Sequence, residues 1–358
     1  SIDTKLKSLV IISPFQFRLR RGAERFTYNL ANQLAKDYDC KIIIYTWGVR
    51  AKIDWGEWND TIKIRTVLFS RYFQGFIAKI FYYFWSKIDQ PNQYILNFLY
   101  HGESILPSSA NIYYVLHSPA SLIPHRYEFI QKEVKKFDRF SFIAVSDAVK
   151  EDAIPYFGNL SIDVIHHGID LNRFNAKTNY IKKEKLKLLS ISALEEWKGI
   201  QDIIKILAQK ELKNKFEYFV IGDGPYKQEL EKLIHDLNLS SSIKLKDSVD
   251  NIESFFPNYD VYCQLSDGEA FGFSLFEAMA CGLPSIVYDI PPFDTLFPSN
   301  VVEKVKNKSQ LELKEKLLGY FDTHKREKIG KSGKIFVNEN FSIESMASHY
   351  HNLIIGTG

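Results

Sequence analysis

The sequence predicts an α/β protein that contains two doubly wound parallel sheets. Short β-branched runs of the buried type, such as residues 9–12, alternate with stretches of helical periodicity. This alternation occurs in two series, separated by the polar, Lys-rich residues 175–187. The length of 358 residues also suits two domains of ordinary size. We therefore expect one domain boundary near Phe174.

The first series begins with a strand at residues 9–12 and a loop through Gly22. A helix follows, with Phe26, Leu30 and Leu34 on one face, and a strand at residues 41–45 completes a βαβ unit. Further strands are expected at residues 112–116, 142–145 and 163–165, separated by helical stretches. Such runs predict a parallel sheet that is covered on both faces.

The second series predicts strands at residues 188–192, 218–221, 243–245, 261–265 and 285–288. The helices between them are expected at residues 200–212, 226–237, 252–256 and 273–281. A last amphipathic helix at 343–355 is expected to pack back on the first domain. The predicted domains are therefore 1–174 together with 343–358, and 175–342.

Composition and charge exclude several classes of protein. The net charge is only +3, too small a surplus for a broad nucleic-acid-binding face. Cys40, Cys263 and Cys281 are far apart in sequence, so neither a disulfide framework nor a zinc knuckle is expected. Residues 1–7 are charged and the apolar run at 9–12 is too short for a signal peptide or a membrane span. We expect a cytoplasmic protein.

The richest stretch, residues 266–284, runs from a strand through a glycine loop and a helix to the next strand. The backbone N–H groups of Phe271 to Ser274 stand at a predicted helix start, where an anion such as a phosphate binds well. Glu269 precedes that helix and Glu277 lies inside it. Carboxylates repel phosphate, so hydroxyl groups are their natural partners. A nucleoside diphosphate sugar offers both kinds of group.

Glu269 and Glu277, separated by seven residues that include Gly272, together with residues 278–284, resemble the signature of retaining family 4 glycosyltransferases of the GT-B fold. The resemblance spans nearly the whole chain. Its other parts are Gly22-Ala23-Glu24, His117, Val145-Ser146, Gly168-Ile169-Asp170 with Phe174, Lys198-Gly199 and Gly222-Asp223-Gly224-Pro225. It implies an acceptor-side domain and a donor-binding domain, both Rossmann-like, that face each other across a cleft.

The resemblance also implies roles for individual residues. Glu269 would bind hydroxyls of the donor sugar, Glu277 the ribose, and Lys198 would neutralise the leaving diphosphate. His117 would lie beside the sugar, which makes Glu269, His117 and Lys198 the expected catalytic residues. The other expected donor-binding residues are Arg21, Gly22, Gly222, Ala270, Phe271, Gly272, Phe273 and Ser274.

Structural interpretations compete with these roles. Taken alone, each carboxylate would be a solvated surface group, Lys198 a surface lysine and His117 a satisfied buried histidine. Gly222 is explained at least as well by a strand-to-helix turn as by ligand contact. The joint order of the motifs favours function for the Glu pair.

Two departures from the family pattern concern charge. Ser192-Ala193 stands where the family has Gly-Arg, so one cation that contacts the donor phosphates is missing. Backbone amides or a basic residue of the first domain, such as Arg18, Arg20 or Arg21, would replace it, or neutralisation of the donor charge would be weaker. The pair Arg21-Gly22, where the family has two glycines, offers one such charge.

A catalytic metal is not expected. His166-His167 replaces the Asn of the family's Asn-Gly, but neighbouring residues on an extended segment point in opposite directions. Asp37-Tyr38-Asp39 has the spacing of a metal-binding motif, yet it falls at the end of the first helix and is better explained as a turn. No cofactor is expected besides the nucleotide-sugar substrate.

An apolar stripe at helical spacing lies within residues 72–88. It comprises Phe73, Phe76, Ile77, Ile80, Phe81, Phe84 and Ile88, and is punctuated by Arg71, Lys79 and Lys87. We favour a helix that turns this stripe to the core of the first domain. The alternative is a membrane-surface helix that brings the enzyme to a lipid-linked acceptor, peripherally at the inner membrane face.

The expected function is a retaining, metal-independent hexosyltransferase that moves a sugar from a nucleoside diphosphate to a glycan or lipid-linked acceptor in cell-surface polysaccharide synthesis. The resemblance implies front-face transfer, because no carboxylate has a precedent as a covalent nucleophile. A catalytically impaired nucleotide-sugar-binding or scaffold protein is the alternative, motivated by Ala193. A nicotinamide-dependent oxidoreductase would need a G-x-G-x-x-G motif that residues 13–22 lack.

Overall fold

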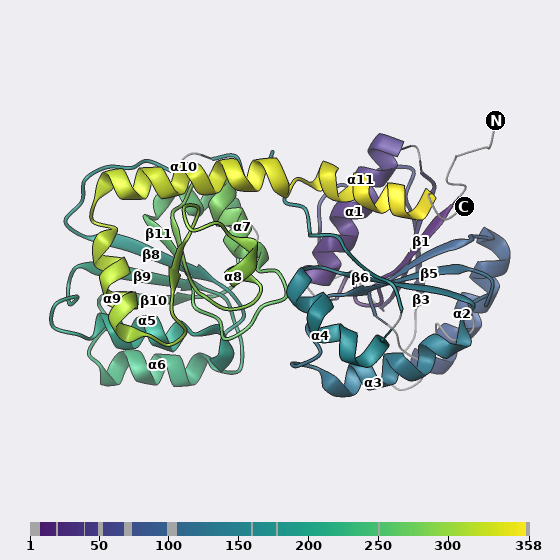
Figure 1. The fold of residues 1–358 in the computed structure, drawn as a ribbon, viewed down its shortest axis with the longest axis horizontal. Helices are drawn as coiled ribbons and strands as arrows, with labels where there is room; N and C mark the ends of the chain where they lie inside the picture. The colour runs from purple at the N-terminus through teal and green to yellow at the C-terminus, as the bar shows by residue number, and fades with distance from the viewer. Residues whose placement is uncertain are drawn as a thin grey trace. The chain divides into compact units, whose positions relative to one another are not determined.

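The computed structural model describes residues 8–18, 21–38, 40–48, 53–67, 74–98, 106–158, 160–176, 178–249 and 251–355. The chain divides into two compact units (Figure 1). The first unit comprises Ser1–Gly168 with Ile343–Gly358, and the second unit comprises Ile169–Ser342.

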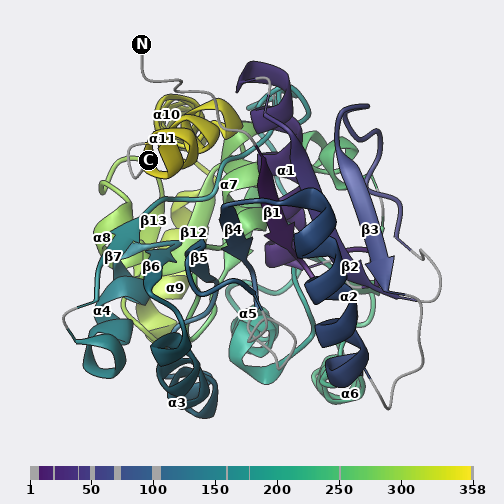
Figure 2. The same cartoon turned by 90° about the vertical axis from the view of Figure 1, so that its right-hand side faces the viewer.

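The first unit contains a seven-stranded parallel sheet of order β3-β2-β1-β4-β5-β6-β7. Figure 2 shows these strands in that order from right to left. The strands are β1 (Leu9–Ile12), β2 (Ile42–Trp47), β3 (Lys63–Val67), β4 (Gln93–Leu96), β5 (Asn111–Leu116), β6 (Arg139–Ala144) and β7 (Ile162–Val164). β1, β2 and β4 are buried along their whole length, which explains their continuous apolar runs.

Five α-helices of the described residues accompany this sheet. They are α1 (Gly22–Tyr38), α2 (Gln74–Asp89), α3 (Pro124–Glu133), α4 (Asp147–Phe157) and α11 (Ile343–Ile355). The C-terminal α11 lies against α1, where the rings of Phe26 and Tyr350 are 5.4 Å apart and those of Tyr38 and His351 stack at 3.8 Å. The end of the chain therefore contributes to the core of the first unit.

The second unit contains a six-stranded parallel sheet of order β10-β9-β8-β11-β12-β13. Its strands are β8 (Leu186–Ile191), β9 (Phe216–Ile221), β10 (Ile243–Lys246), β11 (Val261–Gln264), β12 (Ser285–Tyr288) and β13 (Glu303–Val305). Its α-helices are α5 (Ile200–Leu207), α6 (Lys227–Asp236), α7 (Phe273–Ala280), α8 (Phe293–Leu296), α9 (Gln310–Gly319) and α10 (Thr323–Asn340). Both sheets have the doubly wound strand order, and this confirms the predicted fold class.

The prediction of an α-helix at residues 252–256 is wrong. Two turns of 3₁₀ helix, Ile252–Ser254 and Phe256–Asn258, stand there instead. Pro257 offers no N–H to an α-helix and disfavours the α conformation of the residue before it, so a continuous helix cannot form.

The face that α2 turns to the core also differs from the prediction. Ala78, Tyr82 and Trp85 are buried, whereas Phe84 and Ile88 of the expected stripe are 58% and 67% exposed. The reason is that the aromatic side chains of the buried face also satisfy polar groups: the Trp47 indole donates to the Tyr82 hydroxyl at 2.7 Å. Phe73 and Arg71 lie outside the described residues, as does the side chain of Phe76.

Helix α10 lies close to the turn that joins α7 to β12, and Gly330 permits this approach. A Cβ atom at Gly330 would lie 2.3 Å from the carbonyl oxygen of Gly282 and 2.5 Å from the hydroxyl of Tyr180. Such distances are far below van der Waals contact, so any side chain at position 330 must push the helix outward.

We predict that Gly330→Ala destabilises the protein by about 1–3 kcal/mol, although Ala ordinarily favours a helix interior over Gly by about 1 kcal/mol. The control is Asn338→Ala, at an exposed position of the same helix, where the change is expected to be neutral or slightly stabilising. Chemical denaturation of the two variants and the parent checks this. A Gly330→Ala variant as stable as Asn338→Ala would contradict the close approach.

Candidate functional site

The strand order of the second unit creates a switch point between β8 and β11. From β8 the chain continues to β9 on one side, and from β11 to β12 on the other. Loops that follow such neighbouring strands diverge at the carboxyl edge of the sheet, which is where doubly wound sheets bind ligands. The loop after β8 carries Lys198, and the loop after β11 carries Glu269.

Glycines bring the loops at this edge into direct backbone contact. A Cβ at Gly199 would lie 1.8 Å from the carbonyl oxygen of Leu265, and Gly199 has a φ of +70°. A Cβ at Gly222 would lie 1.8 Å from the carbonyl oxygen of Ser192. The Asp267 N–H donates to the Trp197 carbonyl at 2.8 Å. The loops after β8, β9 and β11 are therefore fixed relative to one another.

Glu269 is held at the switch point by one of its two carboxylate oxygens. Oε1 accepts hydrogen bonds from the Lys198 ammonium at 2.6 Å and from Gln264 Nε2 and Ser266 Oγ, both at 2.9 Å. Within the described ranges, no protein donor reaches Oε2. The carboxylate is thus oriented by the protein and keeps one oxygen as an acceptor for a ligand.

Lys198 is not the surface lysine of the structural interpretation. Its side chain is 15% exposed, pairs with Glu269, and places its Nζ 4.0 Å from the ring centroid of Trp197. Trp197 is itself anchored by a hydrogen bond from its indole N–H to Glu195. A carboxylate and an aromatic face therefore position this ammonium together.

Helix α7 begins directly after this loop, at Phe273, and its N-cap residue Gly272 has a φ of +94°. A Cβ there would lie 3.0 Å from Gln264 Nε2 and from the ring of Phe293, so glycine suits the position on both grounds. The Phe271 ring stacks on that of Phe276 at 4.2 Å. Ala270 belongs to the same loop, and Phe273 and Ser274 begin the first turn of the helix.

Glu277 lies inside α7 and is buried, so it is not a solvated surface carboxylate. Arg173 is its charged neighbour. Burial lowers the pKa of Arg173, but the hydrogen bond to Glu253 at 3.0 Å and the charges of Glu253 and Glu277 outweigh it and raise the pKa. Arg173 was not predicted as a site residue, although it directly precedes Phe174 of the family pattern.

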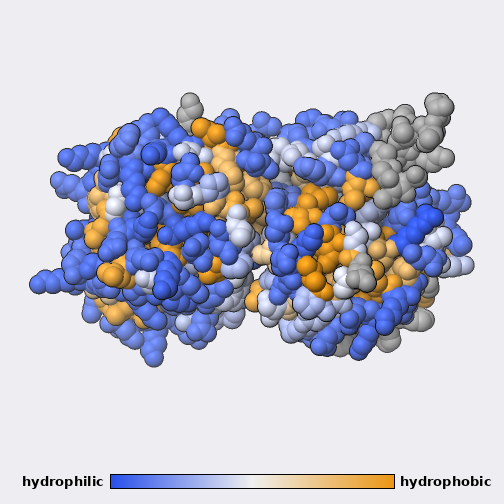
Figure 3. Space-filling view, viewed as in Figure 1, coloured by the Kyte–Doolittle hydropathy of each residue, from blue (hydrophilic) through white to orange (hydrophobic). Residues whose placement is uncertain are grey.

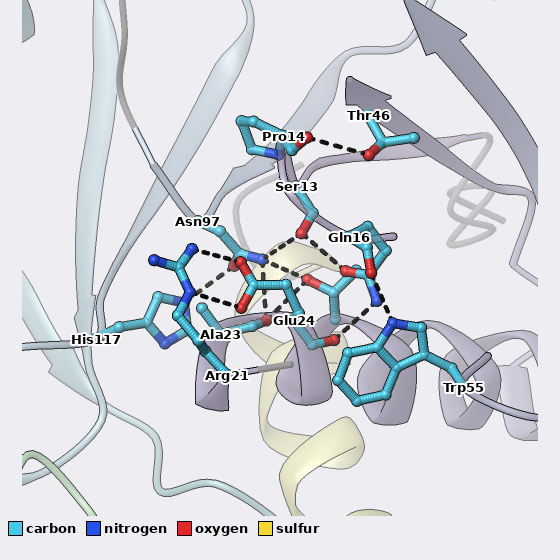
Figure 4. A network of polar contacts seen from close by, with 11 residues as sticks. Ser13, Pro14, Gln16, Arg21, Ala23, Glu24, Thr46, Trp55, Asn97 and His117 are labelled. Atoms are coloured by element: carbon cyan, nitrogen blue, oxygen red, sulfur yellow. Dashed lines mark hydrogen bonds and ion pairs between the residues drawn. The ribbon is translucent and has the colours of Figure 1, made fainter. Parts of the chain in front are cut away.

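The first unit has a second switch point, between β1 and β4, and Figure 4 shows its polar network. Gly22 begins α1, and Arg21 precedes it. The Arg21 guanidinium donates to both oxygens of the buried Glu24, at 2.7 and 3.2 Å, and lies over the rings of Phe15 and Phe98. The positive charge expected of Arg21 is therefore already paired; Arg20 lies outside the described residues.

His117 follows β5 and contacts the same network. Its Nε2 lies 3.0 Å from Asn97 Oδ1, and its ring stacks on that of His167 at 5.5 Å. Burial and the nearby charge of Arg21 lower the pKa of His117 to about 3, so the imidazole is neutral at physiological pH. Asn97 was missed because the strand before it, β4, was not predicted.

His166 and His167 point to different surroundings. His167 is buried beside His117 and Phe26, whereas His166 Nε2 lies 3.9 Å from an Asp147 oxygen. Across the part of the chain that is described, no cluster of three His, Cys, Asp or Glu side chains could hold a metal ion. In the same ranges, no helix is both long and apolar enough to cross a membrane.

Comparisons with known proteins connect both units to one family. The family described as Glycosyltransferase Family 4 matches residues 20–173, and Glycosyl transferases group 1 matches residues 172–335. Among curated proteins, the chain is 30% identical over 199 residues to the O-antigen biosynthesis glycosyltransferase WclY of Escherichia coli, covering 53% of this chain and 54% of that protein. It is 31% identical over 151 residues to the amylovoran biosynthesis glycosyltransferase AmsK of Erwinia amylovora, covering 39% and 37%. The matches thus span about half or less of these relatives.

Solved structures share the fold over almost the entire chain. A sucrose-phosphate synthase from Thermosynechococcus elongatus matches with a TM-score of 0.81 at 16% identity, covering 98% of this chain and 99% of that one. HepE of Anabaena, in complex with UDP and glucose, matches with a TM-score of 0.79 at 17% identity, covering 97% and 99%.

We predict that the coupling energy between Lys198 and Glu269 is larger than that of an exposed ion pair with the same nitrogen-to-oxygen distance. Lys227 and Asp247 are also 2.6 Å apart, but the Asp247 side chain is 81% exposed, compared with 9% for Glu269. In denaturation experiments, the double-mutant cycle of Lys198→Met with Glu269→Gln should give a coupling energy of about 1–3 kcal/mol. The cycle of Lys227→Met with Asp247→Asn should give a coupling energy below about 1 kcal/mol. Equal coupling energies would show that the protein does not orient Glu269 through Lys198.

Proposed function

Because the chain belongs to the group 1 glycosyltransferases of family 4 and has the GT-B fold, we propose that it transfers a sugar from a nucleoside diphosphate to an acceptor hydroxyl with retention of configuration. The observation that carries this proposal is the oriented carboxylate of Glu269 beside the Lys198 ammonium at a switch point. The acceptor is a glycan or a lipid-linked acceptor in cell-surface polysaccharide synthesis, in line with the relatives of O-antigen and amylovoran biosynthesis.

The second unit binds the donor in this proposal. Glu269 Oε2 accepts hydrogen bonds from sugar hydroxyls, and Glu277 accepts them from the ribose. The N–H groups of residues 270–274 and the Lys198 ammonium bind the diphosphate. Gly222 lets the loop after β9 approach the diphosphate. The UDP and glucose in the HepE structure support a donor of this class.

The first unit is the acceptor-side domain in this proposal. It also contributes Gly22 and Arg21 to binding of the donor diphosphate and His117 to the donor sugar. No covalent intermediate is proposed: the bond from the sugar C1 to the leaving phosphate oxygen breaks as the bond from C1 to the acceptor oxygen forms. The acceptor proton passes to the departing phosphate, on the same face of the sugar. Charge stabilisation and orientation supply the rate enhancement.

A catalytically impaired nucleotide-sugar-binding protein is the second candidate. Ala193 is exposed near the start of the loop after β8, where the family has an arginine, and Lys198 is already engaged by Glu269. Such a protein would bind a donor and leave it unhydrolysed.

A peripheral membrane contact through α2 fits a lipid-linked acceptor. Ile80, Tyr83, Phe84 and Ile88 are exposed on this helix, together with Lys87. The only carboxylate of the helix, Asp89, turns inward to Arg65 at 2.6 Å. Exposed apolar and basic side chains suit a surface of anionic lipid. Figure 3 shows apolar areas among the hydrophilic surface of the face that is seen in Figure 1.

We predict that the protein binds one nucleotide sugar of a UDP, GDP, ADP and TDP panel without added metal. Glu277→Ala should weaken binding of both the free nucleotide and the nucleotide sugar by about tenfold or more, the cost of about one lost hydrogen bond to a charged group. Glu269→Gln should weaken only the nucleotide sugar. Titration calorimetry measures both, with Glu315→Ala as an exposed carboxylate control. Unaltered affinities in both variants would contradict the assigned roles.

We predict that the protein floats with vesicles that contain phosphatidylglycerol more than with phosphatidylcholine vesicles. The double variant Phe84→Ser with Ile88→Ser should lose about tenfold or more of this binding, since each side chain buries apolar surface worth about 1.5–3 kcal/mol. Leu311→Ser with Ile335→Ser, which removes two exposed apolar side chains from the second unit, is the matched control. Equal losses in the two double variants, or a loss of self-association instead, would reject a lipid contact through α2.

A further inference from the structure

Asn97 occupies the centre of the polar network in the first unit. It follows β4 and is buried. Its Nδ2 donates to the carbonyl oxygen of Ala23 at 3.2 Å, to Ser13 Oγ at 3.3 Å and to Thr27 Oγ1 (Figure 4). A backbone carbonyl can only accept a hydrogen bond, so the contact with Ala23 determines which end of the amide carries the nitrogen.

The orientation of the amide then determines the protonation of His117. Asn97 Oδ1 is the atom that faces His117 Nε2, at 3.0 Å. A carbonyl oxygen cannot donate, so the hydrogen of this bond belongs to Nε2. In a neutral imidazole the other nitrogen, Nδ1, therefore carries a lone pair. Nδ1 is buried, and no described residue forms a hydrogen bond with it.

We infer that Asn97 is a positioning residue, which holds His117 as its Nε2–H tautomer and so presents the Nδ1 lone pair as an acceptor for a ligand hydroxyl. This inference rests on the proposed function, because it deepens the assignment of His117 to the sugar. It also names the class of group that His117 recognises: an O–H donor, and not a phosphate oxygen, which has no proton to donate.

The groups around His117 keep it neutral. Arg21 lies nearby, with Glu24 as its partner, and His167 stacks on the ring, with His166 and Asp147 beyond it. Burial disfavours the imidazolium, and the charge of Arg21 opposes it further. An amide at position 97 accepts the Nε2 hydrogen without adding a negative charge, whereas a carboxylate there would stabilise the imidazolium.

Neutrality suits the chemistry proposed for the site. Positive charge develops on a sugar as its bond to a leaving phosphate lengthens. A neutral imidazole that accepts a hydroxyl hydrogen bond can orient the sugar without repelling that charge. An imidazolium would have no lone pair for the hydroxyl and would oppose the charge.

The direct test is NMR of the full chain with ¹⁵N-labelled histidine, in which two-bond proton–nitrogen correlations identify the tautomer. The His117→Gln variant identifies the His117 signals among those of nine histidines. We expect a neutral Nε2–H tautomer that does not protonate between about pH 8 and pH 5, since its pKa is lowered to about 3. An Nδ1–H tautomer, or an imidazolium at neutral pH, would overturn the inference without any variant at position 97.

Variants separate positioning from structure. Asn97→Asp should raise the pKa of His117 so that it titrates within the same pH range. Thr27→Val removes one acceptor of Asn97 Nδ2 but leaves Oδ1 in place, so the tautomer and the pKa of His117 should not change. If Asn97→Asp folds and His117 still does not titrate, Asn97 does not control His117.

The same measurements distinguish this inference from the proposed function. With the donor found by calorimetry, Asn97→Ala should lower kcat by about tenfold or more, the energy of one hydrogen bond, with little change in KM. A confirmed tautomer in a protein that binds no nucleotide sugar would reject the proposed function alone. A wrong tautomer in an active transferase would reject the role of Asn97 alone.

Discussion

The backbone contact between Gly199 and Leu265 is the constraint on which the candidate site of the second unit depends. It joins the loop after β8 to the loop after β11, and a Cβ at position 199 would lie 1.8 Å from the Leu265 carbonyl oxygen. Lys198 immediately precedes this contact, and Glu269 follows it by four residues, so the ammonium and the carboxylate meet. The pair is thus a consequence of loop packing, and the glycine that permits the packing is as much a part of the site as the charges.

Both units use the same arrangement of charge. A basic side chain at a switch point is neutralised within its own unit, Lys198 by Glu269 and Arg21 by Glu24. The carboxylate of each pair is largely or fully buried. A diphosphate that binds Lys198 must share it with Glu269, and this sharing links phosphate binding to the orientation of the group proposed to bind the sugar.

Hydrophobic patterning predicted most of the fold, and motif order predicted the regions that carry the candidate site. β12 and α11 have the bounds expected from sequence, and the doubly wound class is confirmed. The patterning failed where apolar residues surround a helix, because α2 has Tyr82 and Trp85 on one face and Phe84 and Ile88 on another. Asn97, Gln264 and Trp197 were not assigned a role, because their importance lies in hydrogen bonds and ring contacts between loops that no spacing within one segment reveals.

The configuration of the released sugar tests the central claim most directly. An α-linked nucleotide sugar that binds the protein would be incubated with it in the absence of acceptor, and the anomer first released to water would be followed by proton NMR before mutarotation. Retaining transfer by front-face chemistry predicts that the α-anomer appears first and that Lys198→Met slows its release. Initial release of the β-anomer would contradict the account, because it would require attack from the opposite face of the sugar.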